Sequence, residues 1–286
     1  MHDKEKDIYI FKPYEIVPFI LEKEKDGMIL YERQKDKGMQ EYGMQEYDPD
    51  WSGTKTLEEA FDKSTKGCKD CASLIKESII PIIRKQNNWG SQYNLPQDYS
   101  GPYVDPGALS LGIPECCIIP EVEKTHKIGD DGIDIVVNTV VSCSVSTDII
   151  RARGVIACAI ALIAERMEIA TRILVGYTNE GGFGYSSKRN DFVITIKNYA
   201  TPIDIPLLAF YLISPASSRR IGFSLFDSVD EGSYKSSHRF AANTAYAKDR
   251  TKKIIIDHGH IRRSMLEPEA AVEEALRILR THGIIK

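Results

Sequence analysis

The sequence has no uninterrupted apolar stretch long enough to span a bilayer, and its start, MHDKEKDIYIFKPYEI, contains no apolar signal core. It also lacks a strong excess of either charge. A net charge of −4 over 286 residues argues against a dominant electrostatic grip on nucleic acid, although a local basic patch stays compatible with one. We therefore expect a cytoplasmic protein with no membrane partner.

Several catalytic signatures are missing as well. The sequence contains no nucleophile elbow, zinc-protease helix or nucleotide fingerprint, and the glycine-rich GGFG at 181–184 lacks the Lys-Ser/Thr ending of a phosphate loop. A hairpin or crossover loop explains that segment. The six cysteines are compatible with reduced thiols. These absences argue against an enzyme, and no cofactor is expected.

What the sequence does contain is an alternation of strand-like and helix-like segments after residue 118. Apolar strands are predicted near 133–142, 171–178, 191–198 and 252–257, with a buried helix over about 149–167 and an amphipathic helix near the end. This order predicts an α/β fold with a mostly parallel sheet flanked by helices. We expect an irregular charged segment over 1–50, a helical subdomain and loop over 51–117, and an α/β domain over 118–286.

Ligands of open α/β sheets bind beyond the carboxyl ends of strands. Three stretches are predicted to end there: the serine-rich 142–148, the loop 198–204 and IDHGH at 256–260. This arrangement resembles von Willebrand factor A domains, whose first strand ends in an Asp-x-Ser-x-Ser loop. The resemblance implies that either Ser142 and Ser144 or Ser144 and Ser146 fill the two serine positions. It implies Thr201 for the threonine and Asp257 with Gly259 for the later aspartate–glycine pair.

The resemblance breaks down at one point, because the aspartate expected two residues before the first serine is absent. A hard divalent cation needs anionic oxygen ligands, so we expect a degenerate adhesion site that holds no stoichiometric metal. A Rossmann-like sheet is the related description of the same fold.

A second resemblance covers about residues 50–230. The segments DWSGTKTLEEAF, YVDPGALSLGIPECC, SVSTDIIRARGVIACAIALIAERM and RRIGFSLFD look like an uncharacterised family of tailed-bacteriophage and prophage proteins. That family supplies an origin more than a mechanism. It implies a protein of the infected host cell or of the virion.

Arginines gather near the predicted ligand edge. Arg151 and Arg153 open a helix whose start is already electropositive, and Arg219, Arg220, Arg262 and Arg263 occur in two further pairs. They either receive a phosphate or a partner carboxylate, or they pair internally with acids such as Asp148, Asp204, Asp227 and Glu165. We expect Arg153 to meet an external anion and Arg151 to pair internally.

Two metal hypotheses are weaker. Cys68, Cys71, Cys116 and Cys117 would supply four zinc thiolates, but adjacent Cys116 and Cys117 point different ways in most backbones, so packing and chance explain them better. His258 and His260 share a strand face and could chelate with His238 as a third ligand. A solvated loop is the simpler interpretation.

The leading hypothesis is therefore a phage-encoded protein–protein interaction or scaffold module that docks a phage or host protein through the ligand edge of its sheet. The first alternative is a nucleic-acid or phosphate-ligand binding protein that uses the arginines. The second is a metal-dependent hydrolase built on Asp257, His258 and His260. The sequence leaves the partner and the oligomeric state open.

Overall fold

The computed structural model describes residues 6–27, 30, 49–85, 93–94, 97–98, 103–104, 109, 117–118, 121–122, 132–139, 145–180, 189–229, 253–256 and 261–285. Outside these ranges lie the candidates Ser142, Ser144, Asp257, His258, His260, His238 and Cys116. Within them, none of the helices combines the length and apolar character that a membrane crossing requires.

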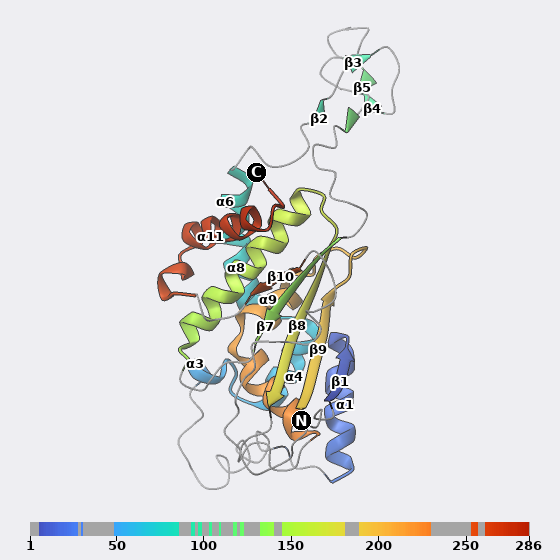
Figure 1. Cartoon of the computed structure of the whole chain (residues 1–286), viewed down its shortest axis with the longest axis vertical. Coiled ribbons are helices and arrows are strands. Elements are labelled where there is room, and N and C mark those ends of the chain that lie inside the picture. The colour runs from blue at the N-terminus through green and yellow to red at the C-terminus, as the bar shows by residue number, and fades with distance from the viewer. Residues whose placement is uncertain are drawn as a thin grey trace, which may run out of the picture.

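Five strands form the main sheet, in the order β1-β9-β8-β7-β10 (Figure 1). They are β1 (Lys6–Phe11), β7 (Ile133–Asn138), β8 (Thr171–Glu180), β9 (Arg189–Lys197) and β10 (Lys253–Ile256). Strand β7 is parallel to β8 and β10, and β1 is parallel to β9, whereas β8 and β9 are antiparallel. The sheet is thus mixed but mostly parallel. The predicted α/β class is confirmed, and all four predicted strands lie in this sheet.

The start of the chain departs from the expectation of an irregular segment over 1–50. Residues Lys6–Phe11 form the edge strand β1, and Pro13–Lys25 form helix α1. The high charge of this region conceals an alternation in which Tyr9 and Phe11 pack against the core while Ile8 and Ile10 are exposed. This segment therefore belongs to the α/β core.

The helices follow the predicted order closely. The first group contains α3 (Pro49–Ser52), α4 (Leu57–Lys66), α5 (Lys69–Leu74), the π-helical turn η1 (Ile75–Ile79) and α6 (Ile80–Lys85). The second contains α8 (Thr147–Arg166), α9 (Ile205–Ile213), the π-helical turn η2 (Ser217–Gly222), α10 (Phe223–Asp227), the 3₁₀ turn η5 (Arg263–Leu266) and α11 (Pro268–Thr281). Helix α8 confirms the helix predicted over about 149–167, and α11 confirms the amphipathic helix predicted near the end.

Short antiparallel strands lie apart from the main sheet, at one end of the molecule (Figure 1). Strand β2 (Tyr93–Asn94) pairs with β6 (Glu121–Val122), and β5 (Cys117–Ile118) pairs with both β3 (Gln97–Asp98) and β4 (Tyr103–Val104). The residues near 118, which we expected to begin the α/β domain, are in these small sheets.

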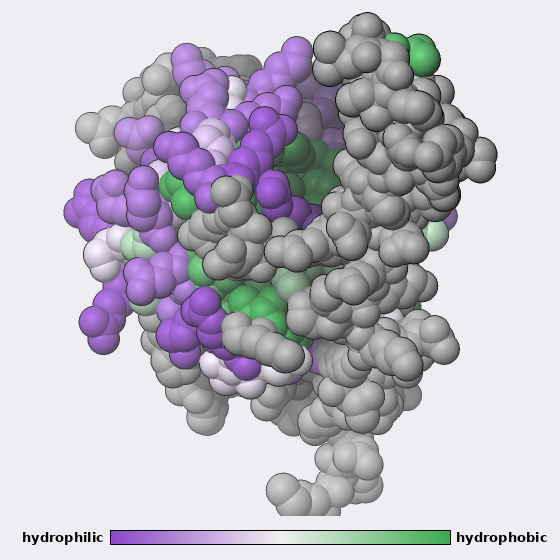
Figure 2. All heavy atoms as spheres, turned by 90° about the horizontal axis from the view of Figure 1, so that it is seen from above, coloured by the Kyte–Doolittle hydropathy of each residue, from purple (hydrophilic) through white to green (hydrophobic). Residues whose placement is uncertain are grey.

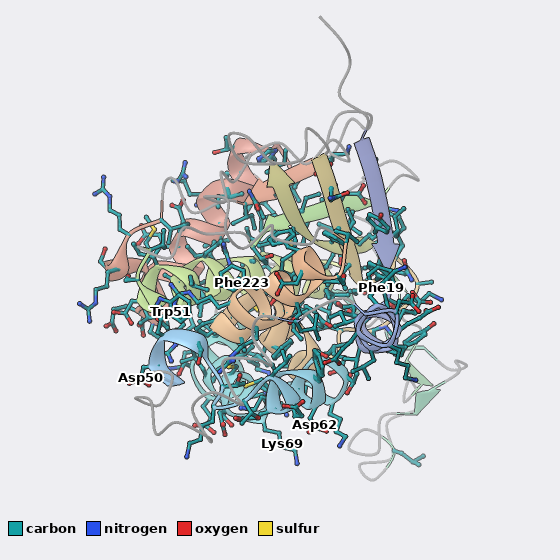
Figure 3. All side chains as sticks on the ribbon, turned by 90° about the horizontal axis from the view of Figure 1, so that it is seen from below. Phe19, Asp50, Trp51, Asp62, Lys69 and Phe223 are labelled. Carbon is teal, nitrogen blue, oxygen red and sulfur yellow. The ribbon has the colours of Figure 1, made fainter. Side chains whose placement is uncertain are left out.

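The described helices cover one face of the main sheet. Along β7, Ile133, Ile135 and Val137 point into the core that contains α8, whereas Val136 belongs to a separate small cluster with Leu174 and Val193 on the opposite face. Figure 3 shows the layers from below, with Asp62 and Lys69 on the outer side of α4 and α5, away from the strands. The main core includes side chains from α1 through α11, so the helices before residue 118 pack into it too.

Small residues allow the helical layer to pack closely. Gly154 of α8 lies so near α9 that a β-carbon added there would be 2.1 Å from the carbonyl oxygen of Leu212. Gly67 ends α4 with a φ of +84°, and its added β-carbon would be 2.5 Å from the carbonyl carbon of Pro206. Both positions therefore require glycine. The two close contacts also fix the positions of the helices that carry the candidate sites.

Candidate functional site

The serine-rich turn after β7 opens helix α8, as the sequence predicts. The Ser146 side chain accepts a hydrogen bond from the backbone N–H of Ile149 at 3.4 Å, and this N-cap uses a donor that would otherwise have no partner in the helix. Ser146 is exposed and the neighbouring Thr147 is half-buried. Of the three serines assigned to the adhesion-like site, Ser146 therefore serves as a helix cap.

Arg219 fastens this turn to the N-terminal helices. Its guanidinium donates hydrogen bonds to the carbonyl oxygens of Trp51 at 2.6 Å and Val145 at 2.5 Å, and to the hydroxyl of Thr147 at 3.2 Å. The same group lies over the Trp51 ring, 4.3 Å from its centroid, in a cation–π contact. Only 1% of Arg219 is exposed. Its charge thus holds three chain segments together.

The other two buried arginines have the same kind of partner. Arg220 donates to the carbonyl oxygen of Lys55 at 3.0 Å and to that of Thr54 at 3.4 Å, and Arg153 donates to that of Asn138 at 2.8 Å. Arg153 is 1% exposed and Arg220 is 0% exposed. The expectation that Arg153 meets an external anion is therefore not supported, because its guanidinium points inward to the end of β7.

Asp148 and Arg151, which we expected to pair with each other, have different neighbours. Asp148 forms an ion pair with Arg263 at 2.7 Å rather than with Arg151. Arg151 is half-buried and close enough to Cys71 to act on it electrostatically. The expected internal pair of Arg151 with its nearest acid is therefore replaced by an ion pair to η5.

Thr201 and Asp204 do not join the serine turn. Because β9 runs antiparallel to β8, its last residue Lys197 pairs with Ile173 near the start of β8. The following loop is therefore at the amino-terminal edge of β7 and β8, opposite Ser146. Thr201 there bonds to the backbone of Asn198, and Asp204 caps α9 by accepting from the N–H of Leu207 at 3.0 Å. The prediction that all three loops converge on one edge is wrong for this loop.

A polar cluster occupies that amino-terminal edge. Arg172 makes a bidentate ion pair with Asp134, at 2.9 and 2.7 Å, and the hydroxyl of Tyr199 donates to the same carboxylate. Burial by itself would raise the pKa of Asp134, but the hydrogen bonds from Arg172 and Tyr199 outweigh it and hold this pKa below its ordinary value. The cluster clips β7 to β8 and to the loop after β9.

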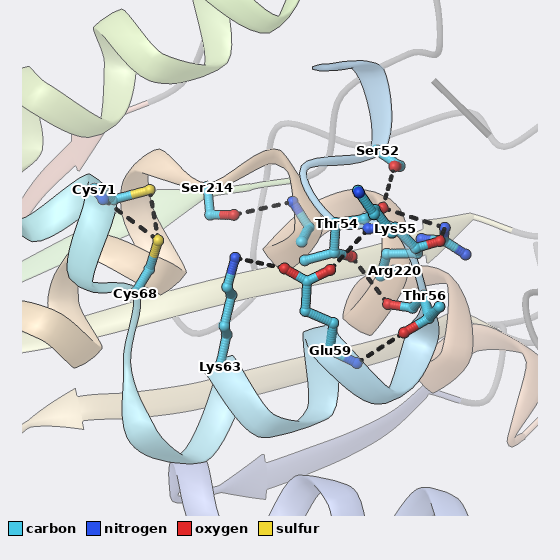
Figure 4. A network of polar contacts seen from close by, with 11 residues as sticks. Ser52, Thr54, Lys55, Thr56, Glu59, Lys63, Cys68, Cys71, Ser214 and Arg220 are labelled. Atoms are coloured by element: carbon cyan, nitrogen blue, oxygen red, sulfur yellow. Dashed lines mark hydrogen bonds and ion pairs between the residues drawn. The ribbon is translucent and has the colours of Figure 1, made fainter. Parts of the chain in front are cut away.

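Two cysteines lie side by side at the start of α5. The sulfur atoms of Cys68 and Cys71 lie 2.9 Å apart and share a hydrogen bond (Figure 4). Cys68 is the N-cap residue, and its sulfur also accepts the backbone N–H of Cys71 at 3.4 Å. From the sequence, we expected these residues to be zinc ligands or packing residues and did not consider redox chemistry. The signal that could have indicated redox chemistry is the Cys-x-x-Cys spacing immediately before a helix.

The environment separates the acidities of the two thiols. The hydrogen bond from the Cys71 thiol lowers the pKa of Cys68 to about 6, with smaller help from the Cys71 N–H and Lys63, against an opposing effect of burial. The pKa of Cys71 is raised by the same hydrogen bond and by burial. The pair therefore holds one shared proton near neutral pH.

An open groove of about 310 Å³ lies along β10 and α11. Its lining combines the apolar residues Ile255, Ile256, Ile261 and Ile278 with the polar residues Glu274, Arg277, Thr281 and His282. Arg277 and Glu274 form an ion pair at 2.6 Å. Figure 2, a view from above, shows hydrophobic patches recessed between hydrophilic side chains.

The described residues contain no group of three or more His, Cys, Asp or Glu side chains placed to hold a metal ion. Of the four proposed zinc thiolates, only Cys68 and Cys71 have side chains within the described part of the chain. The prediction of no stoichiometric metal at the adhesion-like site stays a prediction, since Ser142, Ser144 and Asp257 lie outside the described ranges.

These features define an α/β protein with a mixed, mostly parallel five-stranded sheet, a thiol pair and a groove at one sheet edge. The chain belongs to the family described as domain of unknown function (DUF7192), whose profile matches residues 18–286. Comparison with curated proteins and with solved structures gives no match.

Proposed function

We propose that this protein is an interaction or scaffold module that binds an extended segment of another protein along β10 and α11. The observation that carries the proposal is an apolar groove beside an outer strand. In the described sheet β10 has a neighbour, β7, on one side only. An outer strand presents backbone N–H and C=O groups to which a further strand can bond.

The side chains of the groove suit such a segment. Ile255 is 45% exposed although it lies in the middle of a strand, and the next residue, Ile256, is buried on the opposite face. A partner strand with alternating apolar residues would cover Ile255 and place its other side chains toward the polar residues of the lining. We therefore assign the groove a partner of alternating apolar and polar residues in extended conformation.

The arrangement of β7 and β10 supports a ligand edge of the von Willebrand A-like kind as part of this proposal. Strand β10 lies parallel to β7, so the loops after both strands begin at one edge of the sheet, as the von Willebrand A-like interpretation requires. We retain a degenerate site of that kind, and a phage or host protein as partner, within the proposal. The phosphate-binding alternative gains no support from Arg153, Arg219 and Arg220, which donate to carbonyl oxygens of this chain.

A matched pair of variants tests the groove. Ile255 of β10 and Ile8 of β1 are both 45% exposed and lie in the two outer strands. A displayed library of random peptides would be selected on the wild-type protein, and the affinity of an enriched peptide would be measured by calorimetry. Ile255→Lys should weaken binding roughly tenfold or more, which corresponds to about 1.4 kcal/mol, while Ile8→Lys should not.

Circular dichroism would establish that both variants fold. Equal binding by the two variants, or no enriched peptide with alternating apolar residues, would contradict the proposal.

A further inference from the structure

We infer that Cys68 and Cys71 form a redox-active dithiol that is reversibly oxidised to an intramolecular disulfide by exchange with an external disulfide. The inference is independent of the groove at β10. It rests on four features of the turn between α4 and α5. These are the short distance between the two sulfurs, the position of Cys68 at the start of a helix, the positive charge of Lys63 and the contacts that hold the turn in place.

The sulfur separation comes first. A disulfide bond is about 2.05 Å long, so sulfurs that are 2.9 Å apart need to approach by only about 0.9 Å. The two residues between the cysteines place both sulfurs on the same side of the first helical turn. No third thiol competes for them in the described part of the chain, because Cys158 is fully buried in α8.

The start of a helix favours a thiolate at Cys68. Helix α5 continues through η1 and α6 to Lys85, so a long run of aligned peptide dipoles ends at this cap. The N–H of Cys71 points at the Cys68 sulfur, and Lys63 adds a positive charge from the last turn of α4. Since the thiolate is the nucleophile in exchange, these groups prepare Cys68 for the second attack, on the mixed disulfide at Cys71, near neutral pH.

The turn that carries the pair is held firmly. The N–H of Cys68 donates to the carbonyl oxygen of Pro206 at 2.9 Å, and the preceding Gly67 lies against the same residue. Lys63 is itself held by an ion pair with Glu59 at 2.8 Å, which is visible beside the thiols in Figure 4. The short sulfur separation is therefore a feature of the packed fold.

The difference in solvent exposure between the two cysteines indicates which sulfur reacts first. Cys68 is only 3% exposed, whereas Cys71 is partly exposed. In the minor form of the pair the shared proton lies on Cys68, and the Cys71 thiolate then attacks one sulfur of the external disulfide, which releases the first thiolate. The proton passes from Cys68 to that thiolate. Cys68 then attacks the Cys71 sulfur of the mixed disulfide and releases the second. Two electrons pass to the external disulfide. The shared proton leaves on the first released thiol, and the second leaves as a thiolate that takes its proton from solvent.

The wild-type full-length chain supplies the first test. It would be equilibrated without oxygen in buffers of reduced and oxidised glutathione at varied ratio, quenched in acid, alkylated and mapped by mass spectrometry. Cys68 and Cys71 should disappear together as free thiols and appear as one linked peptide pair, reversibly. Cys158→Ala, the matched control, should give the same titration. Persistence of both free thiols in oxidised glutathione, or one bound zinc per chain that protects them, would overturn the inference.

Two variants test the order. Cys68→Ser, which keeps an N-cap oxygen, should accumulate glutathione on Cys71, because the resolving sulfur is gone. Cys71→Ala should react at least tenfold more slowly, because only the buried sulfur remains. Accumulation on Cys68 in Cys71→Ala at the wild-type rate would overturn the assignment of Cys71 as the entering sulfur. If a variant does not fold, the ultraviolet absorbance of thiolate in the wild-type chain decides instead: a midpoint near pH 6 supports the activated pair, and a midpoint near 9 contradicts it.

Discussion

Replacing Arg219 by alanine should lower the free energy of unfolding by about 3 kcal/mol, although the residue does not line the groove at β10 and α11. The side chain is 1% exposed and its hydrogen-bond partners include the carbonyl oxygens of Trp51 and Val145. Removing the guanidinium leaves these acceptors without that donor inside the protein.

The magnitude follows from the contacts. Each hydrogen bond from a charged donor contributes about 1.5–3 kcal/mol, and a cation–π contact of this kind adds about 0.5–2 kcal/mol. The sum overestimates the loss, because the variant also no longer needs to desolvate a guanidinium. A net loss of about 3 kcal/mol remains. Arg219→Lys should recover little, since one ammonium cannot reproduce the forked contacts to both carbonyls.

Arg263 provides the control at the same helix start. It pairs with Asp148 of α8 at 2.7 Å, but it is 81% exposed, so Arg263→Ala should cost no more than about 1 kcal/mol. Urea denaturation followed by circular dichroism measures both changes. If Arg219→Ala and Arg263→Ala lose the same small amount, the interpretation of Arg219 as a buried clamp is refuted.

Two further changes test the packing and the electrostatics. Replacing glycine by alanine normally stabilises a helix by about 1 kcal/mol. At Gly154 the contact with Leu212 should reverse the sign, so Gly154→Ala should lower the stability measured by thermal or urea denaturation by about 1–3 kcal/mol. A gain in stability would contradict the close approach of α8 and α9. Asp134→Asn should destabilise the protein at neutral pH. The pKa of Asp134 is lowered in the folded state, so its carboxylate contributes fully to the free energy of unfolding above the unfolded pKa of about 3.9. This contribution is lost as the pH falls through the lower folded pKa. The stabilities of wild type and variant should therefore converge in acid. A difference that stays constant from neutral pH into acid would argue against the ion pair with Arg172.

Local chemistry was predictable from the sequence wherever it depends on neighbouring residues. Thr56 caps α4 by accepting from the N–H of Glu59, and Ser146 caps α8, because short hydroxyl side chains at these positions can reach backbone donors. Gly67 ends α4 because it can adopt positive φ. The α/β class followed in the same way from the order of apolar segments.

The direction of β9 was not predictable in this way. Period-two alternation is the same for a strand that runs parallel or antiparallel to its neighbour, and the link over 181–188 suited either a hairpin or a crossover. Pairing with β8 decided it, and with it the separation of Thr201 from Ser146. The strand β1 was missed because its alternation is short and surrounded by charge.

By itself, the sequence determined which segments become strands and helices and where most of them begin and end, because propensity, periodicity and capping act over a few residues. Only the tertiary structure decided where the charges and thiols point. Arg153 and Arg219 look like anion ligands in the sequence, yet they reach carbonyl oxygens up to 168 positions away. The pKa of Cys68 is lowered mainly by the hydrogen bond from the Cys71 thiol, with smaller contributions from the Cys71 N–H and from Lys63 across the turn. Electrostatic and hydrogen-bond energies depend on distance in space and on burial, and both quantities exist only after the chain has packed.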